Sequence, residues 1–330
     1  MNRRLLDFLI DPNDFATLQV RVFEGDTTKG DTAKGDTSKN ESEIREGVLV
    51  NAQTRRWYPI RDGIPSVFCD AFRVGAMKDE DDEFAARYAN ELEDVLHPGA
   101  EHGHDNDSEP SHDFKRIASE RRARDEQAEA YDEMISMKTL HLFEVPAYTR
   151  AMNKFIPTPT DLPLLEAGCG TGRFTDLFAR YGSEVVAVDL SRDSILRNRV
   201  LHRGKTDSPV HYLHADLTHL PLRDNAFGSV ANAGVYEHIP SREMRAQFLE
   251  HTHRVLVAGG AFLLSAYRYG GVTKLMEKEG EHAGGIPFHR FSPAELAEEV
   301  APWFNVTYRQ TNVGIYMTML MATPQAMVGD

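Results

Sequence analysis

The chain has 330 residues and a mass of 37.1 kDa, a length that predicts about two domains. Hydrophobic residues make up 41% of the chain and charged residues 27%, which excludes a fibrous or wholly disordered protein. The 37 Lys and Arg residues against 51 Asp and Glu residues give a net charge of -14, and this excess of acid disfavours a nucleic-acid partner.

Cysteine content and hydropathy exclude further classes of protein. Two cysteines, Cys69 and Cys169, are too few for a disulfide scaffold or a four-cysteine zinc site. No segment approaches the roughly 20 apolar residues that a membrane-spanning helix needs, and the N-terminal residues lack the pattern of a secretory signal. We therefore expect a cytoplasmic protein with no membrane partner.

Residues 1–72 are expected to form a small β-rich module. Its expected strands are short apolar segments bounded by turn signals, at 5–10, 15–23 and several places within 46–68. Residues 25–39 repeat the unit Gly-Asp-Thr-x-Lys three times and contain no apolar side chain larger than Ala. Such a unit cannot bury enough surface to become ordered, so 25–43 is predicted to be a flexible loop within an expanded hairpin.

The middle of the chain is expected to hold helices and a linker. Residues 73–113 are predicted to be a helix followed by a flexible linker; the four histidines within 97–113 lie among Gly, Pro, Ser and acids, which favours a solvated linker over a metal site. Residues 114–160 are predicted to be a helical lid, because apolar residues recur at three- and four-residue spacing. Pro146 is expected to break this region into two helices.

Residues 161–330 alternate apolar segments with amphipathic ones. The expected strands are 163–168, 184–189, 209–215, 228–234, 261–267, 305–311 and 315–323. Strands that alternate with helices indicate an α/β fold with a doubly wound, seven-stranded, mostly parallel sheet and helices on both faces.

A glycine-rich turn directly follows the first of these strands. Residues 166–172 read Glu-Ala-Gly-Cys-Gly-Thr-Gly, and glycines there let the backbone turn tightly and approach a ligand. Asp189 ends the next strand, where its carboxylate can accept both hydroxyls of a ribose. A dinucleotide-dependent oxidoreductase shares this geometry, but its third glycine would fall at Arg173, and this departure disfavours that class.

The amino-acid sequence of this turn resembles the first motif of class I S-adenosylmethionine-dependent methyltransferases. The resemblance continues in chain order with 185–191 as the second motif, 215–227 as the adenine-contacting segment, 235–240 as the element after the fourth strand, and 254–260 as the turn before the fifth. It implies a Rossmann-like fold with S-adenosyl-L-methionine as the cofactor. It also implies that Asp189 binds the ribose, that Asp216 accepts the adenine amino group, and that the backbone of Leu217 borders the adenine ring. The full cofactor-binding set implied in this way is Glu166, Gly168, Cys169, Gly170, Gly172, Asp189, Leu190, Asp216, Leu217 and Asn232, with Tyr131 from the lid.

Methyl transfer is an in-line displacement, and it needs a base only where the acceptor must lose a proton. His238, Tyr236 and His289 are the candidate catalytic residues, because they follow strands at whose ends ligands gather in such sheets. The acidic charge and the resemblance favour a small-molecule acceptor. Two alternatives stay open: a catalytically silent scaffold or activator of another methyltransferase, and a methyltransferase that acts on tRNA or protein.

The N-terminal module carries a second resemblance. Residues 57–60 (Trp-Tyr-Pro-Ile) and 63–65 (Gly-Ile-Pro) resemble a small zinc-ribbon-like family that includes activators of tRNA and protein methyltransferases. Members of that family carry cysteine pairs where this chain has Asp11-Pro12-Asn13-Asp14 and 51–54 (Asn-Ala-Gln-Thr). We therefore expect no metal in this module.

Overall fold

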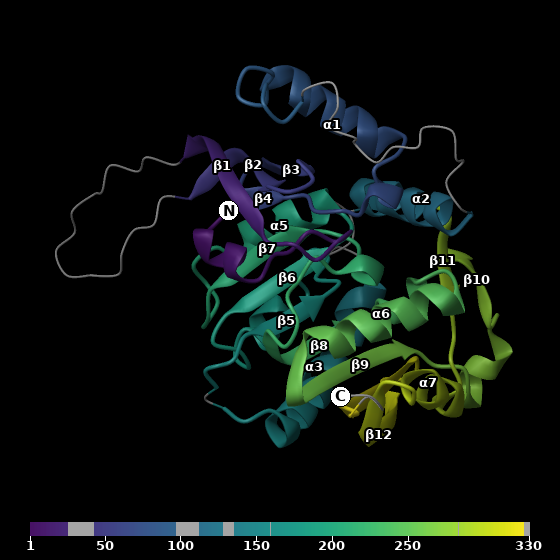
Figure 1. Cartoon of the computed structure of the whole chain (residues 1–330). Helices are drawn as coiled ribbons and strands as arrows, with labels where there is room; N and C mark the ends of the chain where they lie inside the picture. The colour runs from purple at the N-terminus through teal and green to yellow at the C-terminus, as the bar shows by residue number, and fades with distance from the viewer. Residues whose placement is uncertain (26–42, 97–111, 128–134, 159, 283, 327–330) are drawn as a thin grey trace. The chain divides into compact units, whose positions relative to one another are not determined.

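The computed structural model describes residues 1–25, 43–96, 112–127, 135–158, 160–282 and 284–326 (Figure 1). Its contacts divide the chain into two compact units. The first comprises Met1–Pro110 with His211–His214 and Pro221–Arg223, and the second comprises the rest of the chain. No helix in the described part is long and apolar enough to cross a membrane.

The first unit contains an antiparallel sheet in the order β1-β2-β3-β4. These strands are Leu18–Gly25, Ile44–Asn51, Trp57–Arg61 and Ile64–Pro65. The repeat lies in the sequence between β1 and β2, and most of it falls outside the described residues. The strand expected at 5–10 is wrong: Arg3–Asp7 is a 3-10 helix, because the side chain of Asn2 caps it by accepting the N–H of Arg4.

Helix α1 (Ala76–Arg87) also belongs to the first unit, although the sequence placed the end of the module at residue 72. Trp57 on β3 packs in one buried cluster with Phe84 and Tyr88, which come from α1 and its end. The Trp57 and Phe84 rings stack with centroids 6.1 Å apart. Helix α1 therefore covers the ring of Trp57 on the sheet. The sequence pattern did not predict that this helix belongs to the N-terminal module.

A buried polar network joins two turns of the first unit. Asp11 is fully buried; its Oδ2 accepts the Nδ2–H of Asn51 at 2.8 Å and its Oδ1 accepts the hydroxyl of Tyr58 at 2.8 Å. The same Asn51 amide donates to the carboxylate of Asp14 at 3.0 Å. Asn51 Oδ1 accepts the N–H of Gln53 at 3.0 Å. Hydrogen bonds thus connect the two segments where the zinc-ribbon-like family carries its cysteine pairs. Among the described residues, no group of three or more His, Cys, Asp or Glu could hold a metal ion.

The second unit begins with two helices, α2 (His112–Gln127) and α3 (Ile135–Phe155). The expected break at Pro146 is wrong, since Pro146 lies inside α3. Pro146 cannot donate to the carbonyl four residues earlier, at Leu142. Both side chains are exposed, so this carbonyl lies on the solvent-facing side of the helix, where water can bond to it.

The predicted sheet is confirmed: seven strands in the order β12-β13-β9-β8-β5-β6-β7. They are β5 Leu164–Ala167, β6 Val185–Asp189, β7 Val210–His214, β8 Phe227–Ala233, β9 Leu256–Tyr267, β12 Phe304–Val313 and β13 Met317–Pro324. β6, β5, β8 and β9 pair in parallel, and β12 and β13 are antiparallel. The helices between them are α4 Thr175–Phe178, α5 Arg192–His202, α6 Arg242–Val255 and α7 Pro293–Val300.

The order of the sheet places β5 between β6 and β8, so the chain leaves β5 toward one side and later returns on the other. Such a switch point brings the carboxyl ends of neighbouring parallel strands together and leaves a crevice beside them. Helix α6 lies across β8 and β9 (Figure 1). A separate hairpin, β10 (Glu279–His282) with β11 (Ile286–His289), was not predicted from the sequence.

Candidate cofactor and acceptor site

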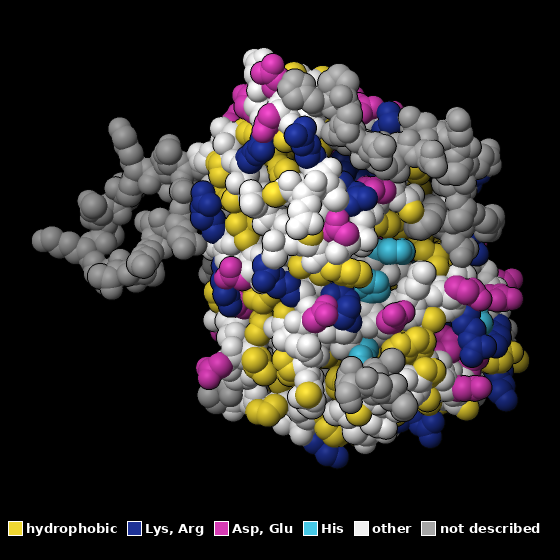
Figure 2. All heavy atoms as spheres, viewed as in Figure 1, with side chains coloured by type: hydrophobic (Ala, Val, Ile, Leu, Met, Phe, Trp, Pro, Cys, Tyr) yellow, Lys and Arg dark blue, Asp and Glu magenta, His cyan; other side chains and the backbone are white. Residues whose placement is uncertain are grey.

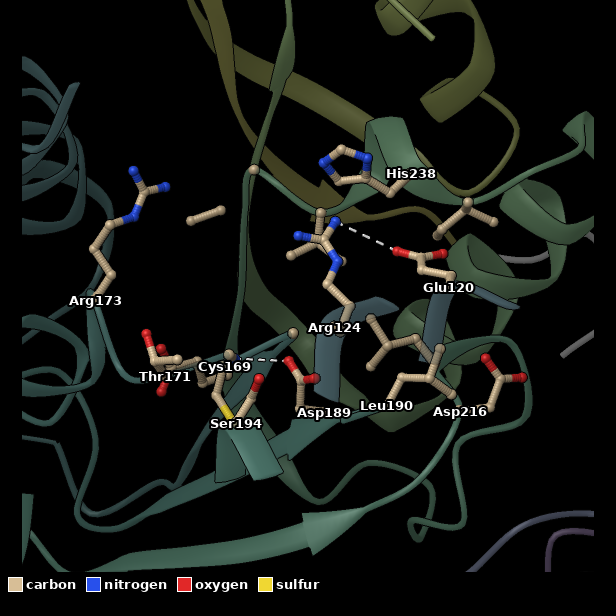
Figure 3. Close-up of a pocket in the computed structure, with 18 of the residues that line it drawn as sticks. Glu120, Arg124, Cys169, Thr171, Arg173, Asp189, Leu190, Ser194, Asp216 and His238 are labelled. Carbon is tan, nitrogen blue, oxygen red and sulfur yellow. Dashed lines mark hydrogen bonds and ion pairs between the residues drawn. The ribbon is translucent and has the colours of Figure 1, made fainter. Parts of the chain in front are cut away.

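A pocket opens at the carboxyl ends of β5, β6 and β8, within the second unit (Figure 3). The segments that follow these strands form most of its wall, and one face of α2 forms another part. Its lining includes the predicted residues Glu166, Gly168, Cys169, Gly170, Asp189, Leu190, Asp216, Leu217 and His238.

The glycine turn adopts a backbone that its residue types allow. Gly168 and Gly170 have φ angles of +87° and +49°, a region that residues with a Cβ rarely occupy. A Cβ on Gly168 would lie 2.5 Å from a methyl of Val235, whereas one on Gly170 would meet nothing within 4 Å. Gly172 does not line the pocket, contrary to expectation: a Cβ there would lie 2.6 Å from His202 Nε2, so this glycine serves close packing against α5.

Asp189 holds the glycine turn. Its Oδ2 accepts the N–H of Gly170 at 2.7 Å, and its Oδ1 accepts the N–H of Ser191 at 2.9 Å. Burial raises the pKa of Asp189, and these backbone hydrogen bonds oppose that rise. Because a carboxylate oxygen can accept more than one hydrogen bond, both oxygens retain capacity for a ligand in the pocket.

Further along the pocket, Asp216 lies beside Leu190 and Leu217, whose side chains supply apolar lining. Its Oδ2 accepts the hydroxyl of Thr218 and lies 3.2 Å from His219 Nδ1. These contacts hold the carboxylate in place at this end of the pocket. The combination of an acid and flanking apolar side chains suits a flat heteroaromatic ring with an amino group.

Two predicted cofactor residues have structural partners. Glu166 lines the pocket, but it is buried and its Oε2 accepts the hydroxyl of Thr175 at 2.8 Å; burial raises its pKa to about 8. Asn232 does not line the pocket; its Nδ2 donates to the carbonyl of Ala167 at 2.9 Å and so joins β8 to the end of β5. The third, Tyr131, lies outside the described residues.

Helix α2 contributes pocket residues that the sequence did not single out. Ile117, Glu120 and Arg124 occur at three- and four-residue spacing and share one face of the helix, which faces the pocket. Burial raises the pKa of Glu120 to about 7, although Arg124 lies 3.4 Å away and opposes the rise. Asp125, next on the helix, accepts the hydroxyl of Ser191 at 2.6 Å and so connects α2 to the start of α5.

His238 is the one catalytic candidate that lines the pocket. Its Nδ1 lies 2.8 Å from the carbonyl oxygen of Pro287. A carbonyl only accepts, so Nδ1 carries the hydrogen and Nε2 keeps a lone pair. Burial and the nearby Arg124 guanidinium hold the pKa of His238 well below its usual value, so the ring is neutral at pH 7 and its Nε2 can accept a proton.

The other two candidates are placed elsewhere. The hydroxyl of Tyr236 donates to Glu299 Oε2 at 2.7 Å, in a buried group that also contains Arg245. His289 lies on β11 with Nε2 2.9 Å from Glu295 Oε1. Neither side chain lines the pocket, so the structure does not bring these two candidates to it.

Arg173, which stands where a dinucleotide site would have its third glycine, also lines the pocket. It forms an ion pair with the buried Glu144 of α3 at 3.0 Å and lies over the ring of Phe174. The ion-pair partner comes from α3, 29 positions upstream, and the glycine-rich motif contains no sign of it.

Comparison with known proteins follows the same part of the chain. Residues 165–264 match a family described as a methyltransferase domain. A malonyl-[acyl-carrier protein] O-methyltransferase of Buchnera aphidicola subsp. Baizongia pistaciae is 40% identical over 72 residues, covering 22% of this chain and 27% of that protein. A probable S-adenosylmethionine-dependent methyltransferase of Mycolicibacterium smegmatis is 32% identical over 137 residues, covering 41% of this chain and 48% of that protein. The chain thus spans less than half the length of either relative.

A solved structure shows the same fold. The 1,6-didemethyltoxoflavin-N1-methyltransferase of Burkholderia thailandensis, solved with bound 1,6-didemethyltoxoflavin and S-adenosylhomocysteine, has a TM-score of 0.52 and 18% identity. The similarity covers 67% of this chain and 93% of that chain. Residues 165–264 thus carry the match to a methyltransferase domain, and the sheet and glycine turn described above belong to a fold that the solved structure shares.

Proposed function

We propose that this protein is an S-adenosylmethionine-dependent methyltransferase that acts on a small-molecule acceptor. The observation that carries the proposal is the pairing, across one pocket, of the Asp189-held glycine turn with the neutral imidazole of His238. One side is suited to a nucleoside-containing cofactor, and the other offers a base to an acceptor.

The donor set fits the cofactor. Asp189 supplies carboxylate oxygens for the ribose hydroxyls, and Asp216 supplies an acceptor for the adenine amino group beside Leu190 and Leu217. A side chain on Gly170 would project into open space at the turn, so its absence leaves room for a ligand close to the backbone. When bound, the cofactor supplies an electrophilic sulfonium methyl.

His238 would prepare the acceptor. Nδ1 is fixed by the Pro287 carbonyl, which orients the ring and leaves Nε2 to accept a proton from an acceptor hydroxyl. Burial of the imidazole keeps the base unprotonated without a neighbouring carboxylate. Two similar proteins favour oxygen as the methylated atom. They are the malonyl-[acyl-carrier protein] O-methyltransferase and a ubiquinone biosynthesis O-methyltransferase of Ruegeria pomeroyi.

The N-terminal unit is proposed as a metal-free relative of small zinc-ribbon-like modules. The hydrogen bonds among Asp11, Asp14 and Asn51 support this proposal, because they join two turns that a bound metal would otherwise hold together.

The test is methyl transfer from radiolabelled S-adenosylmethionine to a small-molecule metabolite extract, with binding of S-adenosylhomocysteine measured by calorimetry. We expect binding and labelled products of low mass. Binding without transfer to any small molecule, tRNA or protein would favour a silent scaffold, and transfer only to tRNA or protein would replace the proposed acceptor class.

A further inference from the structure

Helix α5 holds the carbonyl groups of the glycine turn. His202, the last residue of α5, lies with Nε2 2.9 Å from the carbonyl oxygen of Gly172. One helical turn earlier, the buried Asn198 donates its Nδ2–H to the carbonyl oxygen of Gly170 at 3.4 Å. Gly172 does not line the pocket, but the residues on either side of it in the sequence do. A shift of the Gly172 carbonyl therefore moves the wall of the pocket.

The partners of His202 determine how many hydrogens its ring carries. Nε2 faces the Gly172 carbonyl, and Nδ1 lies 2.7 Å from Oδ1 of Asp176 on α4. A carbonyl oxygen only accepts hydrogen bonds. The Asp176 side chain is 56% exposed, and an exposed carboxyl is ionised at neutral pH, so it too only accepts. Both ring nitrogens must therefore carry a hydrogen, and in this arrangement His202 is an imidazolium.

The surroundings of α5 bear on a cation at His202. The C-terminal end of a helix favours a cation, because its last carbonyls carry partial negative charge. Arg199, three residues earlier on α5, opposes a second positive charge, but the carboxylate of Asp176 contacts the ring directly. Asp125 of α2 contacts the start of α5, and Asp189 of β6 accepts two backbone N–H groups. Among the described residues, Asp176 is the acid whose contact with His202 the structure records.

We propose that His202, as an imidazolium, is a positioning residue for the cofactor: it holds the carbonyl of Gly172, and the glycine turn binds S-adenosylmethionine more tightly when His202 is protonated. Loss of the proton leaves one N–H for two acceptors. The ring then keeps either the Gly172 carbonyl or Asp176, and a nitrogen lone pair faces the other acceptor. Because an imidazole exchanges its proton near neutral pH, the affinity for the cofactor falls as the pH rises. This inference rests on the proposed function and adds a pH dependence to its cofactor site.

Three variants separate the proton of His202 from the rest of the site. His202→Gln keeps an N–H donor for the Gly172 carbonyl but does not titrate, because the amide nitrogen of Gln can reach the position of Nε2. Asp176→Asn offers an N–H to a neutral imidazole, so that the ring no longer needs a second hydrogen. Asp161→Asn is the matched control, because it removes the same charge from another exposed side chain, just before β5.

Two measurements are made on each protein between about pH 5.5 and 8.5, the range in which imidazoles titrate. The first is the affinity for S-adenosylhomocysteine by calorimetry. The second is the titration of the His202 ring by NMR, with and without S-adenosylhomocysteine. The chain has 14 histidines, and histidine side chains reach the surface in Figure 2, so the His202 resonances are assigned by their absence from the spectrum of His202→Gln. By linkage, a ligand that prefers the protonated ring raises its titration midpoint.

Relative to His202→Gln, the wild-type affinity should fall about 3- to 10-fold as the pH rises, as for one lost hydrogen bond. The ligand should raise the His202 midpoint by about 0.5 to 1 pH unit. Asp176→Asn should lower this midpoint, and Asp161→Asn should match the wild type. Equal pH profiles for the wild type and His202→Gln, or a midpoint that the ligand does not move, would overturn the inference while leaving the proposed function intact. A wild type that binds no S-adenosylhomocysteine at any pH would remove the proposed function itself, and the inference with it.

Discussion

At the scale of single residues, function depends on which atoms the fold leaves available. Tyr236 and His238 are two positions apart, yet the hydroxyl of Tyr236 is bonded to Glu299 while the Nε2 of His238 keeps its lone pair at the pocket. Burial then keeps this imidazole neutral. The difference between the two candidates lies in their partners, and each partner is at least 49 positions away in the sequence.

The role of His238 leads to a kinetic prediction. His238→Gln keeps a polar side chain but removes the base, so kcat should fall about 100- to 10,000-fold, while affinity for S-adenosylhomocysteine stays near that of the wild type. Because the pKa of His238 is held well below 6.5, its ring resonances should show no titration between pH 6 and 8 by NMR. A His238 titration near pH 6.5, or a variant with wild-type kcat, would contradict the assignment.

The sequence was sufficient for residues whose role is local and insufficient for those whose role depends on distant partners. Gly168 and Asp189 were found because a turn and the end of a strand are local features. Arg124 and Glu120 were missed as individual positions, because helical spacing shows that residues share a face without showing what that face contacts. For the same reason the sequence did not show that His289 lies outside the pocket lining, on a hairpin where its Nε2 contacts Glu295.

At the scale of elements, the positions of the central strands were predicted more accurately than the ends of the helices. The β5 and β6 segments are continuous buried runs of the kind typical of central parallel strands, and their predicted bounds differ from the observed ones by about one residue. Pro146 misled the prediction because a proline inside an exposed helical face can be solvated. The β10–β11 hairpin was missed because its residues do not alternate between apolar and polar.

The polar network of the first unit gives a prediction at this scale, since it joins two separate turns. Asn51→Ala leaves the buried carboxylate of Asp11 without one of its donors and should lower the free energy of unfolding by about 1–3 kcal/mol. The matched control is Gln53→Ala in the same turn, where the side chain is exposed. Urea denaturation of both variants tests this, and equal stabilities would show that the network contributes nothing.

At the scale of the whole molecule, buried acids make stability depend on pH. Glu166 and Glu237 have pKa values of about 8 and Glu120 of about 7, all raised by burial from 4.5. The folded protein therefore binds more protons than the unfolded chain above pH 4.5, and it loses them as the pH rises toward 8. The lowered pKa values of His238 and His251 act in the opposite direction, but only below about pH 6.5.

The free energy of unfolding should therefore fall between pH 6.5 and 8, by about 1–2 kcal/mol per pH unit. Urea denaturation at several pH values measures this slope. Glu166→Gln removes one of the titrating groups and should make the slope shallower. Stability that is constant or increases over this range would show that these carboxyls are ionised in the folded protein.

The central claim is that the turn held by Asp189 binds the cofactor, and titration of S-adenosylmethionine into the wild type, Asp189→Ala and Asp189→Asn tests it most directly. Asp189→Ala removes the acceptors of both ribose hydroxyls, so affinity should fall about 30- to 1000-fold. Asp189→Asn keeps one acceptor and should bind with intermediate affinity. Because Asp189 also accepts the N–H of Gly170, the alanine variant should lose about 1–2 kcal/mol of stability as well, which a melting curve without ligand measures separately. Equal affinities for the three folded proteins would contradict the cofactor assignment.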